Sequence, residues 1–259
     1  KKGITGGKIL SFILVFVVMG LFSFSLFNND NARSVYIYQE DNEDWMEIRS
    51  NIDLSVEDVT ETYKTQLGLS DSDELVFMRV DQDQVGQEHY RFQHFHKNIK
   101  VEGSQLLVHT RNDRVYLVNS TLVKGLMNPV ILNINEDSAI KKAISQLPAD
   151  KYMWESEWAE RLIKKVSKDP TATNYPDPTL VWVSPKYSRN AAEYTLAYDM
   201  TIHSIEPELK RRYFINAVDG STTLTINDLH EGSTPGVGES KYHGTVDIIT
   251  DSLASDSYR

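Results

Sequence analysis

The sequence predicts an α+β protein built from two small units, each a helix followed by an antiparallel sheet. Two observations support this fold class. Apolar residues recur at helical spacing in two parts of the chain, and each helical part precedes a run of strand-like segments separated by turns. The 259 residues are 40% hydrophobic and 25% charged, so the chain has the composition of a globular protein that buries a core.

An apolar stretch near the N-terminus precedes both units. Ile9–Phe27 carries no charge and follows Lys1, Lys2 and Lys8, an order typical of a secretory signal. We therefore expect residues 1–27 to be a signal peptide, with an uncleaved membrane anchor as the alternative, and the rest of the chain to be secreted. The sequence contains no cysteine, which excludes disulfides, thiolate metal sites and a cysteine nucleophile.

The first unit is predicted over residues 51–128, after a polar and acidic linker at residues 28–50 with one short strand at Ser34–Tyr38. Its helix begins at Ser55, which forms a capping-box-like pair with Asp58, and ends at Gly68. The alternating segments that follow predict four strands joined by turns at Lys97-Asn98 and Asn112-Asp113: Glu74–Val80, Glu88–His96, Ile99–His109 and Val115–Val118.

The second unit is predicted over residues 129–228. Asp137 or Ser138 caps a helix that Pro148 ends. A second helix, at about residues 154–166, places four apolar side chains at helical spacing: Trp154, Trp158, Leu162 and Val166. We expect Trp154 and Trp158 to lie in the core. After a proline-containing loop at 168–178, four strands follow, the last two joined by a turn at Asp219-Gly220: Thr179–Ser184, Glu193–His203, Lys210–Ala217 and Ser221–Ile226.

The chain changes character after residue 228. Residues 229–238 are rich in Gly, Ser and Pro, and we expect them to be an exposed connector that is sensitive to proteolysis. The strand-like run Lys241–Asp251 lies within residues 239–259, which we interpret as the start of a further domain that is cut off at Arg259.

The sequence predicts no catalytic or metal-binding residue in this segment. A net charge of −10 disfavours binding to phosphate backbones. His230-Glu231 does not extend to the H-E-x-x-H zinc motif, because Thr234 stands in place of the second histidine. No G-x-S-x-G motif or glycine-rich phosphate loop is present. A metal site through His94, His96 and His109 is a weaker alternative to a packing role for these histidines.

Residues 89–103 resemble the core of the fungalysin/thermolysin propeptide (FTP) domain, which shows an Arg-aromatic-Gln run, a short turn, a Val-x-Gly run and a later Val-His pair. His94 and Lys100 depart from the usual Gln and Pro of that pattern. The residues that carry the resemblance are His89, Tyr90, Arg91, Phe92, Gln93, Val101, Gly103 and His109.

Residues from about 136 to 228 resemble a PepSY domain. The matching positions include Tyr198, Asp219 and Gly220, whereas Asn216 departs from the usual Asp. The tail from Gly236 to Val246 is similar to the opening of the mature thermolysin-like catalytic domain.

Together these resemblances imply the N-terminal fragment of a secreted thermolysin-like zinc metalloendopeptidase precursor. Residues 51–228 are then two pro-domains, FTP-like and PepSY-like, that act as intramolecular chaperone and inhibitor of the chain's own catalytic domain. No cofactor is expected in this segment, and zinc, with calcium, would belong to the missing domain. The full enzyme would act on protein or peptide substrates, without nucleic acid, and would meet the membrane only through its N-terminal signal.

The resemblance also implies a maturation cut in the connector, within the run Asp228, Leu229, His230, Glu231, Gly232, Ser233, Thr234 and Pro235. Two other functions remain open. One is a membrane-anchored extracytoplasmic binding or inhibitor module without enzyme activity. The other is an independent metal binder through the three histidines named above.

Overall fold

The structure is a computed structural model that describes residues 35–39, 42–228, 233–240, 244–254 and 257–258. It is dominated by one curved eleven-stranded sheet, and the end of the chain forms a separate three-stranded sheet. Helices are few and short, and nearly all strand pairs are antiparallel. The α+β fold class predicted from the sequence is confirmed.

The first half of the large sheet follows the predicted strand order closely. Its strands are β1 (Tyr36–Gln39), β2 (Asn42–Ile48), β3 (Asp73–Gln82), β4 (Glu88–His96), β5 (Ile99–Arg111) and β6 (Arg114–Ser120). Both predicted turns are tight hairpins in which the two central residues have positive φ, at Lys97-Asn98 and at Asn112-Asp113.

The prediction that residues 28–50 form a linker is wrong for Asn42–Ile48, which form strand β2. β1 pairs with β2, and β2 pairs with β6, so this part of the chain belongs to the sheet. Tyr36 and Met46 are buried in the core of the first half. Because acidic residues surround these apolar side chains, the sequence did not indicate the strand pair, in which side chains alternate between core and solvent.

The helix predicted at Ser55–Gly68 consists of two short turns, η1 (Asp58–Thr62) and η2 (Lys64–Leu67). The predicted capping pair is present: the amide of Ser55 donates to Asp58, and the amide of Asp58 donates to Ser55 Oγ, over 2.9 and 3.1 Å. Gly68 ends the segment with φ +83°. Val59 and Leu67 are buried against the sheet, so the segment covers the core of the first half.

The second half holds the regular helices. These are α2 (Glu136–Ser145) and α3 (Glu157–Ser167), and its strands are β7 (Lys151–Tyr152), β8 (Thr179–Val183), β9 (Thr195–Glu206), β10 (Glu208–Asn216) and β11 (Thr222–Asn227). Two 3-10 turns accompany them, η3 (Met153–Glu155) and η4 (Ala191–Glu193). α2 is capped by Asn135, whose side chain accepts from the amide of Ser138, and not by Asp137 or Ser138.

The prediction that Trp154 and Trp158 both lie in the core is wrong for Trp158. Trp154 packs against the core of the second half and stacks on Tyr152 at 4.4 Å between ring centroids. In contrast, the side chains of α3 that share its outer face are exposed, with relative exposures of 60% for Trp158, 41% for Leu162 and 70% for Val166. Ala159, one residue after Trp158, is the buried contact of this helix.

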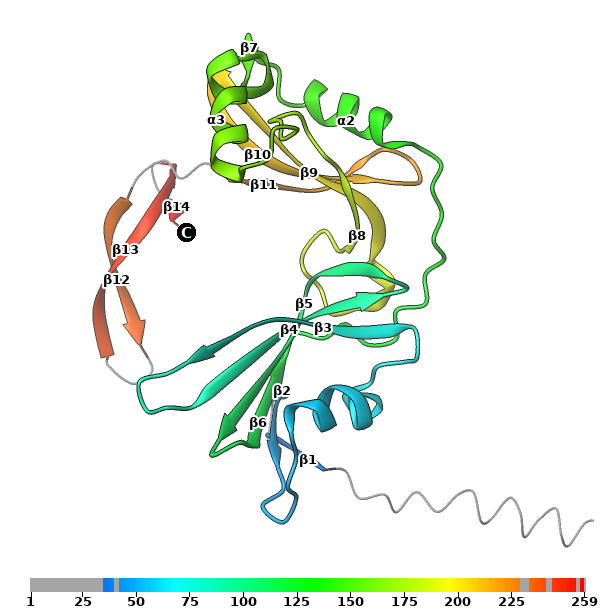
Figure 1. The fold of residues 1–259 in the computed structure, drawn as a ribbon, viewed down its shortest axis with the longest axis vertical. Coiled ribbons are helices and arrows are strands. Elements are labelled where there is room, and N and C mark those ends of the chain that lie inside the picture. Colours follow the sequence, from blue (N-terminus) through cyan, green and yellow to red (C-terminus); the bar gives the residue numbers. More distant parts are fainter. Residues whose placement is uncertain (1–34, 40–41, 229–232, 241–243, 255–256, 259) are drawn as a thin grey trace, which may run out of the picture.

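The two halves share one sheet because β5 changes partner along its length. Residues 106–111 of β5 pair with β6, whereas Lys100 and Val101 pair in parallel with Val181 and Trp182 of β8. Gly103, with φ +76°, lies between these two sections. Figure 1 shows the result, an arc with the first half below, the second half above and β5 and β8 between them.

The connector predicted at residues 229–238 is a strand from Ser233 onward. β12 (Ser233–Ser240) pairs with β13 (Gly244–Ala254), and β13 pairs with β14 (Ser257–Tyr258). Residues 229–232 lie outside the described residues, as do residues 1–34, which include the predicted signal. Within the described parts of the chain, no helix is long and apolar enough to cross a membrane.

Candidate functional site

The most polar part of the interior lies where β4 approaches the second half. Asp73 at the start of β3 is buried, and its Oδ1 accepts from His94 Nε2 at 3.1 Å and from His96 Nδ1 at 2.7 Å. Its Oδ2 accepts from the amide and the hydroxyl of Ser70, both at 2.7 Å. Burial alone raises the pKa of Asp73, but these hydrogen bonds outweigh burial and hold the pKa well below its usual range. Asp73 is therefore a charged carboxylate that organises two buried imidazoles.

Ser104, His94 and Asp73 are joined in the order of a hydrolytic triad. His94 Nδ1 lies 2.8 Å from Ser104 Oγ, and its Nε2 contacts Asp73 as described above. All three side chains are buried, and Ser104 Oγ also accepts from the amide of Val123 at 3.0 Å. A nucleophile must reach its substrate, so this chain of hydrogen bonds is a structural network and not an active site.

The clustered histidines form two separate pairs. His94 and His96 converge on Asp73, whereas His109 Nδ1 lies 2.6 Å from His89 Nδ1 on the neighbouring strand. Burial lowers the pKa of His109, a hydrogen bond from its ring to Asn119 opposes this effect, and the nearby charge of His89 lowers the pKa further. In the part of the chain that the structure describes, no three His, Asp or Glu side chains are arranged to hold a metal ion. The metal site drawn through His94, His96 and His109 is therefore not assembled.

Gln93 and Gly103 shape the point where β5 passes between the two halves. The buried side-chain amide of Gln93 donates to the carbonyls of Val101 and Ser104, at 2.8 and 2.9 Å, on either side of Gly103. Gly103 has φ +76°, and a Cβ there would lie 2.9 Å from Tyr187 Cδ1, so any other residue would be strained and would displace the tyrosine ring. Val101 belongs to the core of the second half, although it lies in a strand of the first half. These motif residues fix the bend in β5.

The other predicted motif residues on β4 are also structural. Arg91 Nη1 donates to Gln105 Oε1 at 2.7 Å, Tyr90 donates its hydroxyl to Glu88 at 2.7 Å, and Phe92 is buried in the core of the first half.

In the second half, the predicted motif residues also have structural contacts. The hydroxyl of Tyr198 donates to the carbonyl of Ile134 at 3.0 Å. Asp219 and Gly220 form the turn between β10 and β11, where Asp219 Oδ1 accepts from the amide of Ser221 at 2.8 Å.

An ionic network also joins the two halves at this junction, the place where β5 passes from the first half to the second. Arg212 of β10 donates to both carboxylate oxygens of Glu102 on β5, at 3.1 and 3.0 Å. It also donates twice to Asp199 of β9, at 2.7 and 2.5 Å, and its guanidinium lies 4.6 Å from the ring centre of Phe214. Asp199 raises the pKa of Arg212, burial opposes this effect and Glu102 adds to it, so the charge of Arg212 is fixed.

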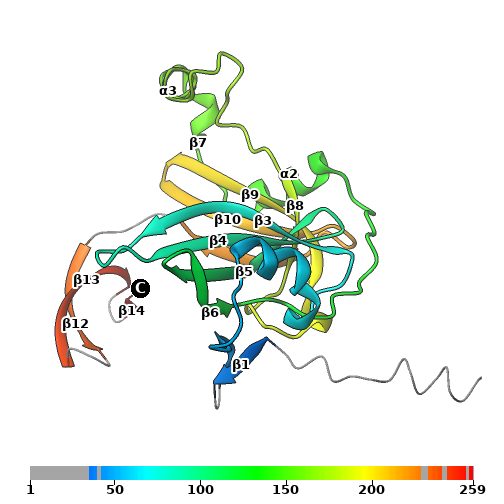
Figure 2. The same cartoon turned by 60° about the horizontal axis from the view of Figure 1, so that its bottom comes forward.

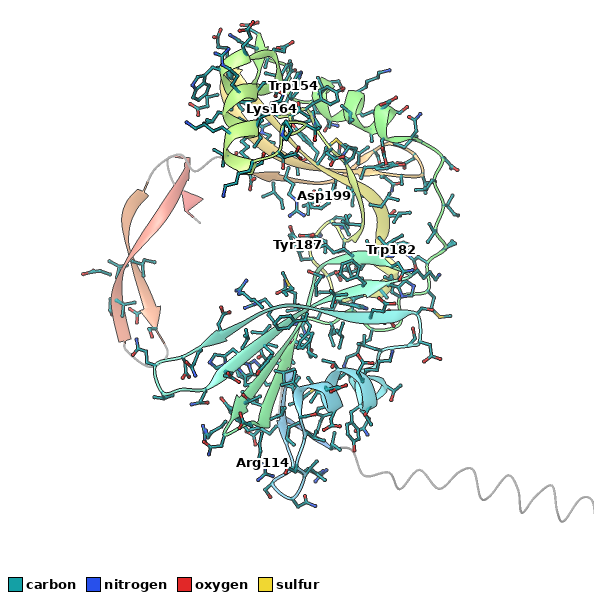
Figure 3. The ribbon with its side chains drawn as sticks, in the orientation of Figure 1. Arg114, Trp154, Lys164, Trp182, Tyr187 and Asp199 are labelled. Atoms are coloured by element: carbon teal, nitrogen blue, oxygen red, sulfur yellow. The ribbon has the colours of Figure 1, made fainter. Side chains whose placement is uncertain are left out.

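Glu102 is charged as well. Burial raises the pKa of its carboxyl group, but Lys100 at 2.8 Å and Arg212 outweigh burial and lower the pKa. Also at the junction, Trp182 Nε1 donates to the carbonyl of His96 at 3.2 Å. Figure 3 labels Trp182 at the junction and Tyr187 and Asp199 on the inner side of the arc. The two halves are thus held by a shared sheet and by paired charges.

Of the residues at the predicted cleavage segment, the structure describes Asp228 and the backbone of β12. Asp228 pairs with Lys210 at 3.1 Å, and its amide donates to the carbonyl of Lys210 at 2.9 Å. Ser233, Thr234 and Pro235 lie opposite Asp251, Thr250 and Ile249 of β13. Leu229, His230, Glu231 and Gly232 lie outside the described residues.

Sequence reasoning missed the residues that organise this junction. In the sequence, Asp73 is an acidic residue at the start of a strand, and nothing around it indicates that it is buried. Glu102 and Arg212 are 110 positions apart, so no local pattern indicates that they pair. The only available signal was the position of Glu102 inside the Val-x-Gly motif, next to Gly103.

A family model covers the strands that build this junction from the first half. Residues 73–122 match the FTP motif, the Fungalysin/Thermolysin Propeptide Motif. The FTP segment begins at Asp73 and spans β3 to β6, together with the buried histidines and the bend at Gly103.

Two similar proteins were also found. Over 177 residues the chain is 26% identical to Bacillolysin of Bacillus amyloliquefaciens, a match that covers 65% of this chain and 30% of that protein. The Bacillus megaterium YpeB C-terminal domain is 12% identical, with 71% of this chain and 70% of that chain covered and a TM-score of 0.33. The FTP match and the similarity to Bacillolysin confirm the predicted resemblance to the pro-region of a thermolysin-like metalloprotease precursor.

Proposed function

We propose that residues 51–228 are the pro-region of a secreted thermolysin-like zinc metalloendopeptidase precursor, and that they act as intramolecular chaperone and inhibitor of its catalytic domain. The observation that carries the proposal is the FTP match, because it coincides with the complete strand set β3 to β6. The second half, with α2 and strands β8 to β11, is assigned by the same proposal to a PepSY-like pro-domain.

The physical basis of the chaperone role is binding linkage. A pro-region that binds the folded catalytic domain, and not the unfolded one, stabilises the folded state by mass action. Tethering in one chain keeps the local concentration of the partner high without any new contact. The shared sheet and the Arg212 network support this role, because they hold the two halves as one binding surface.

The chemistry of the enzyme belongs to the part of the precursor after residue 259. The imidazoles of His89, His94, His96 and His109 are engaged with Asp73, Ser104, Asn119 or one another, and the Ser104 hydroxyl is buried. We therefore assign zinc, the catalytic carboxylate and any calcium to the downstream domain, and no hydrolytic activity to residues 51–228.

The first test is to read the gene past residue 259. The proposal requires an H-E-x-x-H helix about a hundred or more residues downstream, with a third zinc ligand after it. A reading frame that ends near Arg259 would contradict the proposal and would leave an extracytoplasmic binding or inhibitor module as the function.

The second test measures the chaperone and inhibitor roles directly. The catalytic domain is denatured and refolded with and without the purified 259-residue chain, and the recovered peptidase activity is followed over time. We expect active enzyme only when the chain is present during refolding, and we expect the same chain to inhibit enzyme that is already folded. Equal recovery without the chain, together with no inhibition, would exclude both roles.

The third test locates the maturation cut. Because Ser233–Pro235 pair with β13, and pairing protects the backbone, we propose that the cut falls between Asp228 and Ser233. N-terminal sequencing of the secreted enzyme tests the site, and a mature start before Leu229 or after Ser233 would contradict it.

A further inference from the structure

α3 carries an exposed apolar stripe, formed by Trp158, Leu162 and Val166. The three residues are four positions apart, so their side chains follow one another along one side of the helix, each turned by about 40° from the last. All three are exposed, with Trp158 and Val166 more than half accessible. Single exposed apolar residues are common, but an aligned row that includes a tryptophan marks an interaction surface.

The position of α3 makes the stripe accessible. Figure 2 shows the helix standing clear of the sheet. Its principal packing partner among the described elements is the adjoining turn η3. Ala159 is its buried contact, and Glu160 secures the following loop by accepting from the amide and the side chain of Asn174, at 2.8 and 3.1 Å. The stripe is therefore accessible to a partner, and its first residue, Trp158, lies next to the ends of β9 and β10.

Basic residues border the stripe. Helical geometry places Lys165 about 20°, and Arg161 about 60°, to one side of Trp158. Glu157 and Glu160 lie on other sides of the helix, where Glu157 pairs with Arg161 and Glu160 with Asn174. From Glu157 to Lys168 the chain has four basic residues and two acidic ones, although the whole protein has a net charge of −10. The charge next to the stripe is thus opposite in sign to that of the protein.

Aromatic rings extend the apolar surface beside the helix. Trp154 stacks on Tyr152 and meets Tyr175 edge-on at 5.5 Å between centroids, and Tyr175 is about half exposed. Trp158 also lines a hollow of about 400 Å³ together with Met153 and Ile205. Tryptophan and tyrosine favour the boundary between lipid headgroups and acyl chains, because one end of each ring system is polar and the rest is apolar.

We propose that α3 docks on the surface of an anionic phospholipid bilayer, with Trp158, Leu162 and Val166 entering the headgroup boundary and Arg161 and Lys165 contacting lipid phosphates. Charge complementarity selects this occupant. A basic and apolar helix face fits a surface that is apolar below and acidic above, whereas a second copy of the chain would bring like charges together. The inference does not depend on the proposed function, because it concerns only the surface of the second half.

The test uses the 259-residue chain and the fluorescence of its own tryptophans. The chain is mixed with vesicles whose acyl chains carry bromine, a quencher of tryptophan, made either of phosphatidylcholine alone or with added phosphatidylglycerol. We expect quenching only with phosphatidylglycerol, and we expect Trp158→Phe to remove most of it. Trp45→Phe is the matched control, because Trp45 is also partly exposed but lies on β2, and it should leave the quenching unchanged. This readout reports on α3 even if the N-terminal apolar stretch also binds the vesicles.

A charge variant tests the headgroup contact. We expect the double substitution Arg161→Gln with Lys165→Gln to weaken binding to phosphatidylglycerol vesicles about fivefold for each residue. The matched control is Lys124→Gln with Lys141→Gln, two exposed lysines elsewhere in the chain, which should have no effect. Thermal unfolding of every variant checks that the fold is intact.

Three results would overturn the proposal. The first is quenching of equal size with phosphatidylcholine alone, and the second is quenching that survives in Trp158→Phe. The third is the absence of quenching with both kinds of vesicle.

Discussion

The two halves of the sheet are both covered by helical segments, but they use them differently. In the first half the short turns η1 and η2 bury Val59 and Leu67, and little of their apolar surface is left outside. In the second half α2 buries Ala139, Ile140 and Ala143, whereas α3 leaves its apolar stripe in solvent. Apolar residues at helical spacing therefore do not by themselves show that a helix packs on the protein's own core.

The halves also differ in how they use charge. Asp73 is a charged group inside the first half, with two histidines and a serine around it. The charges of Glu102, Asp199 and Arg212 lie at the junction, on the inner side of the arc. The first half is thus organised internally by a buried carboxylate, and the second half is attached to it by the partly accessible ionic network of Arg212.

The largest expected effect tests the difference between the two helices of the second half. We expect Ile140→Ser to lower the free energy of unfolding by about 4 kcal/mol, because it removes a buried side chain of α2 and buries a hydroxyl. The matched variant Leu162→Ser on α3 should change it by less than about 0.5 kcal/mol. Denaturant unfolding measures both, and similar losses at the two sites would show that α3 is packed in solution.

Replacing the buried carboxylate should have the next largest effect. Asp73→Asn keeps the shape but removes the charge that His94, His96 and Ser70 all contact, and we expect a loss of about 3 kcal/mol in the free energy of unfolding. Asp71→Asn, two residues earlier and exposed, is the control and should be neutral. A neutral Asp73→Asn would mean that the charge of this cluster is unimportant.

Removing the ionic network of Arg212 should lower the free energy of unfolding by less, and it should let the two halves unfold separately. Arg212→Ala leaves Glu102 and Asp199 without their shared guanidinium, and we expect a loss of about 2 kcal/mol, reduced because Arg212 is a quarter exposed. Calorimetry should then show two unfolding transitions where the parent protein shows one. The neighbouring Arg211→Ala is the control. A single unshifted transition in Arg212→Ala would indicate that the shared sheet alone couples the halves.

Mild acid should have the smallest effect, and it should act on the first half through His109. The pKa of His109 is lowered in the folded protein, so the neutral ring is favoured there. Its contribution to stability is complete above the unfolded pKa of about 6.5 and is lost as the pH falls through the lower folded pKa. We expect the melting temperature to fall between neutral pH and pH ~5. His109→Gln should reduce that slope, and a melting temperature that rises in acid would contradict this account.

The sequence predicted the strands and turns of this fold better than its surfaces. Period-two alternation located β4 and β5, and the pairs Lys97-Asn98 and Asn112-Asp113 predicted tight hairpins that the structure contains. These features are local, and local patterns are readable from neighbouring residues.

What the sequence did not predict depends on contacts between distant residues. Glu102 and Arg212 show no mutual signal, and the burial of Asp73 follows only from the pairing of β3 with β4. The stripe of α3 has the spacing of a core face, and only its place outside the sheet distinguishes it from α2. The FTP resemblance marked Gly103 as a motif residue, but the bend there, with its positive φ and the nearby Tyr187, came from the structure.

The parallel pairing of β5 with β8 sets an order of events during synthesis. Lys100 and Val101 meet Val181 and Trp182, so the central strand keeps one open edge until some eighty further residues have emerged. Closure of so long a loop is slow compared with the hairpins on either side. A nascent chain halted between these strands would expose that edge to its neighbours, and pausing or chaperone protection in this interval would decide how much of the protein is recovered intact.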